Sequence, residues 1–95
     1  MEKIEYTGSV FLLDHKYPDP LLNHSIKKLE GLGIKKEDIT ITDSPEKPKI
    51  DDIVVEVFPY HLEIARVRTI RNDSFISGSL MTVELKADAN GKYID

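Results

Sequence analysis

The sequence has no cysteine and no long apolar run. Without cysteine, a disulfide framework, a thiolate metal site and a cysteine nucleophile are all excluded, so stability must come from apolar burial. The N-terminal stretch holds one short apolar run, residues 10–13, far below the ~18 residues of a membrane span. It also lacks the basic-then-apolar order of a signal peptide. We therefore expect a cytoplasmic protein that enters no membrane.

Positive charge is also in short supply. The 13 basic residues are outnumbered by 17 acidic ones, which gives a net charge of -4, so the field of the whole protein does not favour a polyanion. Hydrophobic residues at 40% and charged residues at 32% are ordinary for a folded domain. A chain of 95 residues is long enough for one core and too short for two, so we expect a single domain over residues 1–95.

One helix is marked by its end signals. Asp19 is the expected N-cap, Pro20 suits the first helical position, and Gly31 or Gly33 suits the end. The apolar side chains follow the spacing of one buried helical stripe, formed by Leu21, Leu22, Ile26 and Leu29.

The remaining pattern predicts strands. They are expected at residues 4–13, 38–43, 50–58, 61–71 and 77–87, with an exposed loop at 44–49 and a short C-terminal tail at 92–95. The order β-α-β-β-β-β predicts an α+β fold, a mixed sheet of about five strands with one helix packed on one face. Because a helix of about 15 Å covers roughly three strands, we expect the remaining apolar surface to be covered by a second copy, in a homodimer.

The strand at residues 61–71, HLEIARVRTIR, carries three arginines. By simple alternation Arg66 and Arg68 share one face and Arg71 lies on the other, with Ala65 and Val67 on the face expected to meet the core. A bulge would exchange the two faces, since one inserted residue shifts the alternation.

Two readings of these arginines compete. In the first, Arg66, Arg68 and Arg71 form an anion- or partner-binding surface, and Lys35 and Lys36 add a basic patch at the end of the helix. With these lysines the surface would be a nucleic-acid-binding module, although few strand aromatics are present to stack on bases.

In the second reading the arginines form ion pairs across the sheet. Glu56 and Glu84 stand on the neighbouring strands and are the expected partners of Arg66 and Arg68. We favour this structural role, because paired surface charges are the usual case.

The C-terminal stretch KADANGKYID resembles part of a calcium loop. Asp88, Asn90 and Gly91 match three positions, but Lys86 stands where the first carboxylate is required and no final glutamate follows. We interpret the stretch as a turn in which Gly91 has a positive φ, followed by a short return strand at residues 93–94.

No catalytic constellation is evident. His15, His24 and His61 lack metal-ligand spacing, His24 falls on the polar face of the helix, and no glycine-rich phosphate loop opens a helix. One enzyme-like alternative remains, in which Asp14 and His15, after the first strand, surround an anion together with the arginines. It requires the end of that strand to lie near the arginines.

The sequence therefore predicts a small interaction or regulatory protein that acts through an exposed sheet face or edge, with no catalytic residue, cofactor or metal. We expect a protein partner in preference to nucleic acid, with the arginines as polar anchors.

Overall fold

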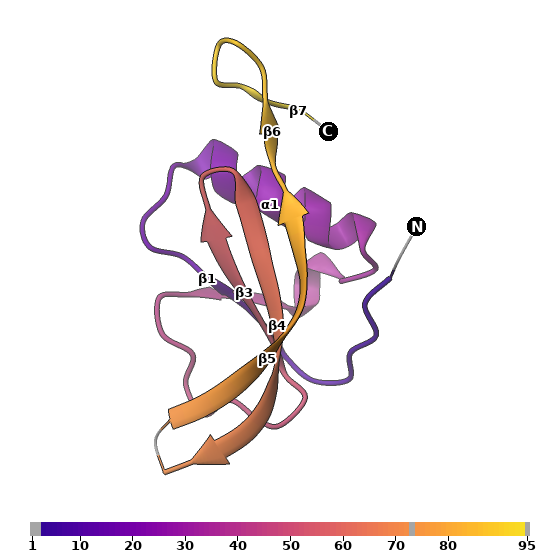
Figure 1. Cartoon of the computed structure of the whole chain (residues 1–95), viewed down its shortest axis with the longest axis vertical. Coiled ribbons are helices and arrows are strands. Elements are labelled where there is room, and N and C mark those ends of the chain that lie inside the picture. Colours follow the sequence, from indigo (N-terminus) through magenta and orange to yellow (C-terminus); the bar gives the residue numbers. More distant parts are fainter. Residues whose placement is uncertain (1–2, 73, 95) are drawn as a thin grey trace.

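The computed structural model describes residues 3–72 and 74–94, and these form one helix packed on a mixed sheet (Figure 1). The sheet order is β2-β1-β3-β4-β5, and β6 and β7 form a separate two-stranded ribbon. The elements are β1 (Val10–Leu13), α1 (Asp19–Gly31), the short 3-10 helix η1 (Lys36–Asp38), β2 (Ile39–Thr42), β3 (Ile53–Phe58), β4 (His61–Arg71), β5 (Ser74–Glu84), β6 (Lys86–Ala87) and β7 (Tyr93–Ile94). The predicted α+β class, with five strands and one helix, is confirmed.

The centre of the sheet is parallel and its second half is antiparallel. β1 pairs in parallel with both β2 and β3, and β3, β4 and β5 form an antiparallel meander. The expected first strand was too long at its start, because β1 begins at Val10. Residues 4–9 instead run along the helix end, where the Ile4 backbone N–H donates to the Leu32 carbonyl (2.8 Å).

The helix begins one residue earlier than predicted. Pro18 is the capping residue and Asp19 is already helical, so the assignment of Asp19 as N-cap was wrong. No side chain caps this end, although the carbonyl of Pro18 accepts the backbone N–H groups of Leu21 and Leu22. Asp19 still favours the helix, because a negative charge in the first turn complements the helix dipole.

Gly33 ends the helix. Its φ of +94° belongs to the left-handed region, and its N–H donates to the Glu30 carbonyl while the Ile34 N–H donates to the Leu29 carbonyl. These two bonds form a Schellman motif, in which Leu29 and Ile34 also meet in the core. Of the two glycines that the sequence offered, Gly33 is the one whose conformation stops the helix.

The core lies between α1 and one face of the sheet, here named the helix face. On α1, Leu21, Ser25 and Leu29 are buried, whereas Leu22 and Ile26 are half-buried. The Ser25 hydroxyl donates to the Leu21 carbonyl (2.7 Å), which satisfies it in the core. The main sheet residues of this core are Val10, Leu12, Ile53, Val55, Val57, Leu62 and Ile64.

This arrangement corrects the expected faces of β4. Leu62 and Ile64, and not Ala65, face the helix, and both are fully buried. Val67 is also fully buried, as expected, but on the opposite or far face, near the start of β3. On the far face in the middle of the sheet, Glu56 and Glu63 stand directly opposite each other.

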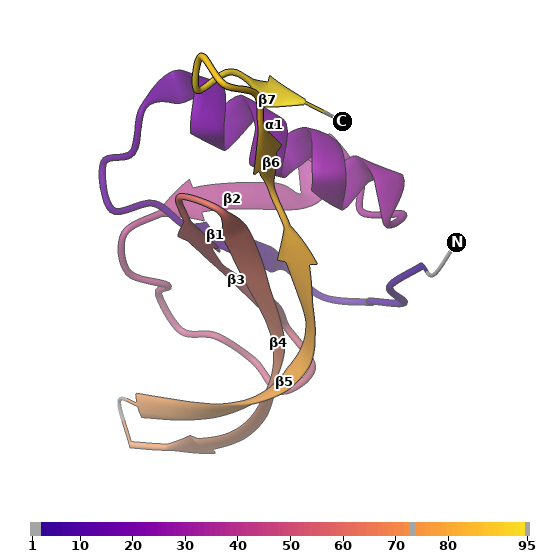
Figure 2. The ribbon, with the colours of Figure 1, turned by 45° about the horizontal axis from the view of Figure 1, so that its top comes forward.

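The β4–β5 hairpin continues past the end of β3 and away from the helix (Figures 1 and 2). β4 pairs with β3 only as far as Arg66, with two further backbone bonds at Val67. Beyond this point each strand has only the other as a sheet neighbour. We name this part, residues 68–72 and 74–79, the arm.

None of the helices in the part of the chain that the structure describes is both long and apolar enough to cross a membrane.

Candidate interaction surface on the β4–β5 arm

Two bulges change which side chains share a face of the arm. Between Ile64 and Ala65 the register skips Leu80 on β5, and between Val67 and Thr69 it skips Arg68 on β4. Each bulge inserts one residue and shifts the alternation of the strand that contains it.

The bulge at Arg68 brings all three arginines to one face. Arg66 lies opposite Gly78 and Arg71 lies opposite Ser74, and β5 runs regularly between these two partners. Because alternate residues of a regular strand share a face, Ser74, Ile76 and Gly78 lie on the same side, which is the helix face. The sequence-based placement of Arg71 opposite Arg66 was therefore wrong. From Gly78 to Ser74 the row spans about 14 Å, at ~3.4 Å per residue.

Arg66 is bound by the chain itself. Its guanidinium donates to the Glu5 carbonyl (Nη2 to O, 2.7 Å) and, at 3.5 Å, to the Asp51 carbonyl. The side chain is half-buried and holds the N-terminal segment against the sheet. Arg66 is thus a structural link at the inner end of the row.

Arg68 lies over Gly78. A Cβ at Gly78 would be 3.0 Å from Arg68 Nε and 3.3 Å from Cγ, so the arginine side chain uses space that only glycine leaves open. The guanidinium nitrogen Nε of Arg68 therefore lies over β5. Arg71 is exposed near the tip, where the Ser74 hydroxyl donates to its carbonyl. Among residues 3–72 and 74–94, no hydrogen bond or ion pair engages the guanidinium of Arg68 or Arg71.

β5 is an edge strand, and its outward backbone groups can be identified. Val67 exchanges backbone hydrogen bonds with Asp51 and Asp52, so its N–H and C=O point away from β5. Its partner Ser77 must then direct its own N–H and C=O to the free edge, as must Phe75 and Ser79 by alternation. The strand has neither charge nor proline from residue 74 to 83, although charge and proline are common protections of an edge.

The predicted ion pairs with glutamates are absent. Glu56 lies opposite Glu63, and Glu84 lies opposite His61, at the far end of β4 from the arginines. His61 Nε2 lies 3.7 Å from Glu63 Oε1. The ion-pair hypothesis was wrong because the register of the meander places the charges of opposite sign at opposite ends of the strand.

Lys35 and Lys36 are exposed at the same end of the sheet as Arg66, but they lie near the opposite edge, just before β2. β2 follows them and is separated from β4 by β1 and β3, a distance of roughly 14 Å at ~4.8 Å per strand. The N-terminal segment fills the space between, where Tyr6 donates to Asp38 (2.6 Å) and accepts the Lys35 N–H (2.9 Å). The bond to Asp38 raises the pKa of Tyr6 above its ordinary value. Because this carboxylate lies in between, the lysines and arginines do not form one continuous basic surface.

The enzyme-like alternative fails on position. Asp14 and His15 follow the carboxyl end of β1, which lies beside Glu56. Arg66 is beside Ile53, at the amino end of β1. The two groups therefore stand at opposite ends of the sheet and cannot surround one anion.

His24 is buried, which corrects its placement on a polar face. The β6–β7 ribbon folds back on α1, so that Tyr93 stacks on His24 with ring centroids 5.3 Å apart. Tyr93 also donates to the Pro59 carbonyl (2.8 Å), and burial, with a smaller effect of Tyr60, raises its pKa. Gly91 has the expected positive φ of +81° in the turn of this ribbon.

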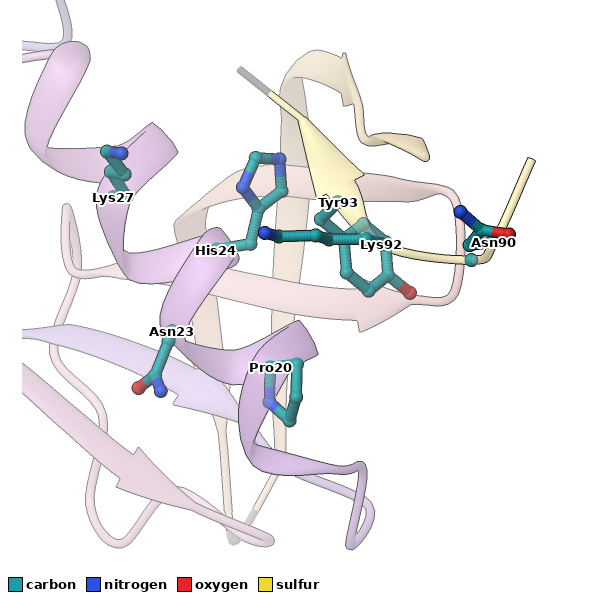
Figure 3. Close-up of a pocket in the computed structure, with 8 residues that line it drawn as sticks. Pro20, Asn23, His24, Lys27, Asn90, Lys92 and Tyr93 are labelled. Carbon is teal, nitrogen blue, oxygen red and sulfur yellow. The ribbon is translucent and has the colours of Figure 1, made fainter. Parts of the chain in front are cut away.

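An open groove of about 470 Å³ remains between the helix and this ribbon (Figure 3). Its lining residues are Pro20, Asn23, His24, Lys27, Asn90, Gly91, Lys92 and Tyr93. The groove is basic. Its two rings, His24 and Tyr93, stack on each other, and Tyr93 also donates to the Pro59 carbonyl. We therefore assign these two side chains the role of holding the C-terminal ribbon against the helix. Residue 95 of the predicted tail lies outside the described residues.

Metal ligands do not gather anywhere in residues 3–72 and 74–94, since no three His, Asp or Glu side chains are placed to hold an ion. Comparisons of the chain with protein-family models, curated proteins and solved structures find no match.

Recognition at a sheet face or edge was expected from the sequence, but neither Gly78 nor β5 was identified as part of that surface. A glycine inside a strand is a recognised sign of a bulge or of a close approach, so the signal was present. The strand order that leaves β5 at the edge has no local signature.

Proposed function

We propose that this protein is a small cytoplasmic, non-catalytic interaction or regulatory protein that binds a partner protein along the free edge of β5. The supporting observation is that Phe75, Ser77 and Ser79 offer backbone N–H and C=O groups on a strand without charge or proline. An extended segment can add to such an edge as a further strand. The exposed Arg68 and Arg71 are the polar anchors of the same surface.

Ser77→Pro tests this proposal with little risk to the fold. Proline removes the N–H that points outward and leaves the β4–β5 hydrogen bonds in place. Ser77→Thr keeps the N–H and is the matched control. Random linear peptides displayed on phage are selected on the wild type and measured on both variants.

We expect proline-free peptides that bind the wild type and Ser77→Thr alike and bind Ser77→Pro at least tenfold more weakly. Peptides that bind all three proteins equally would contradict recognition by the edge.

Homodimerisation remains a prediction. The sequence argument was that one helix leaves apolar sheet surface for a second copy to cover. The structure weakens this argument, because the large exposed hydrophobic side chains, such as Ile41 (47%) and Ile76 (61%), are scattered and none of them lies on β1 or β3. A dimer formed by pairing of two β5 edges would occupy the edge that the partner segment needs, so it is the alternative to partner binding at this edge. Light scattering should then give twice the monomer mass for the wild type and the monomer mass for Ser77→Pro.

Nucleic-acid binding is the second candidate, and the arginine row favours it, because a two-stranded ribbon fits the major groove of DNA. It predicts binding of a DNA duplex that weakens steeply with salt and decreases in Arg68→Gln and Arg71→Gln. Unchanged affinity in both tests would remove this candidate.

A further inference from the structure

Because Gly78 has no side chain, Arg68 can lie over β5 and contact a segment that binds to the β5 edge. Arg68 Nε lies against Gly78 of β5, the outermost strand of the sheet. A strand added to this edge would lie ~4.8 Å further out and would direct alternate side chains to the same face. A carboxylate opposite Gly78 would then be within reach of Arg68, and Arg–carboxylate pairs are among the strongest charge-assisted hydrogen bonds.

The pairing pattern supports this contact. Because Ser77 and Ser79 carry the outward backbone groups, Gly78 would form a non-hydrogen-bonded pair with an added antiparallel residue. In such pairs the side chains approach more closely than in hydrogen-bonded pairs.

The neighbouring positions extend the pattern. Ile76 is 61% exposed and shares the face with Gly78, so the residue that docks opposite Ile76 should be aliphatic. Ser74 is small and lies opposite Arg71, which allows Arg71 to reach a second carboxylate. The surface therefore favours a docking segment that has a carboxylate, an aliphatic side chain and a second carboxylate at alternate positions.

A second copy of β5 does not have this pattern. On the helix face, the half of β5 nearest the core has Met81 and Val83, which are apolar. The only carboxylate of β5 is Glu84, and it lies on the far face, opposite His61. Charge complementarity therefore favours a different acidic segment. Residues 66–79 contain three arginines and a single acidic residue, Asp73, which lies outside the described residues.

We propose that the β5 edge of the arm binds an extended acidic segment of a partner protein, with an acidic–x–aliphatic–x–acidic pattern whose carboxylates are bound by Arg68 and Arg71. This inference rests on the proposed function and names the chemistry of the partner. Gly78 is a positioning residue, because a Cβ there would be 3.0 Å from Arg68 Nε and the arginine would have to shift.

Three synthetic heptapeptides test the inference, each N-acetylated and C-amidated: TETVTET, TQTVTQT and TKTVTKT. They are titrated into the ¹⁵N-labelled protein, and the amide signals of residues 74–79 are followed by NMR. We expect TETVTET to bind at least tenfold more tightly than TQTVTQT, and TKTVTKT to bind most weakly.

Variants then assign the preference to its residues. Arg68→Gln and Gly78→Ala should each reduce the advantage of TETVTET over TQTVTQT to threefold or less. Arg66→Gln is the matched control, because Arg66 is bound to Glu5 and should leave the advantage unchanged.

The outcomes separate the two proposals. Equal binding of TETVTET and TQTVTQT at residues 74–79, or an advantage that survives Arg68→Gln, would overturn the inference and leave edge recognition standing. No shift of these amides with any peptide would overturn both. Shifts of the arm signals with a DNA duplex but not with TETVTET would assign the arginines to phosphates and would also overturn the inference.

Discussion

Replacing Asp52 by alanine should destabilise the protein more than any other single change of an acidic residue that we can identify. Asp52 is only 4% exposed, and its carboxylate accepts the backbone N–H groups of Ser9 (3.0 Å) and Lys49 (2.8 Å). It thereby joins the N-terminal segment to the β2–β3 connection. Gly8 lies so close that a Cβ there would collide with Asp52 Oδ1.

The expected cost follows from these two bonds. A hydrogen bond to a charged group contributes about 1.5 to 3 kcal/mol. Because Ser9 and Lys49 are exposed, water can partly replace the lost acceptor, so we take the lower value for each and expect a loss of about 3 kcal/mol. For a domain of this size such a loss lowers Tm by roughly 12 to 24 °C.

Urea unfolding followed by circular dichroism measures the loss. Asp52→Asn should lose about half as much, because its amide keeps one acceptor and turns a donor toward the other N–H. Asp43→Ala, an exposed acidic residue in the same connection, is the control and should change stability by less than about 0.5 kcal/mol. If Asp52→Ala unfolds at the same urea concentration as Asp43→Ala, the account of Asp52 is wrong.

Two further predictions concern the helix end and the C-terminal ribbon. Gly33→Ala should cost about 1 to 2 kcal/mol of unfolding free energy in urea, because Gly33 has a φ of +94°, whereas Gly31→Ala, within the helix, should be neutral or stabilising. Because burial raises the pKa of Tyr93, its contribution to stability is fully present below the unfolded value of 10.0 and is lost as pH rises through the higher folded value. Stability measured from pH 9 to 11 should therefore fall less in Tyr93→Phe than in the wild type, and equal curves would contradict this.

The sequence predicted the elements whose signals are local. The helix was marked by Pro20, by Gly31 or Gly33 at its end and by its apolar spacing, and β4 was predicted with the observed bounds. The return strand after Gly91 was also correctly predicted. Each of these follows from backbone preferences of a few adjacent residues.

The parts that failed depend on contacts distant in the sequence. His24 is buried only because a ribbon some 70 residues later covers it, and Arg66 is bound by the carbonyl of Glu5. The common face of the arginines depends on a bulge at Arg68, which alternation alone cannot locate. The candidate surface therefore required the register of the sheet.

The separation of the arm from the core has a consequence for how this protein can change. None of the described arm residues, 68–72 and 74–79, belongs to the hydrophobic core cluster, so substitutions along the arm remove little of the burial that holds the fold together. Most single mutations cost stability, and a protein near its threshold can accept few of them. A binding strand outside the core relaxes that constraint, and successive variants can acquire new partners while the folded body remains as it is.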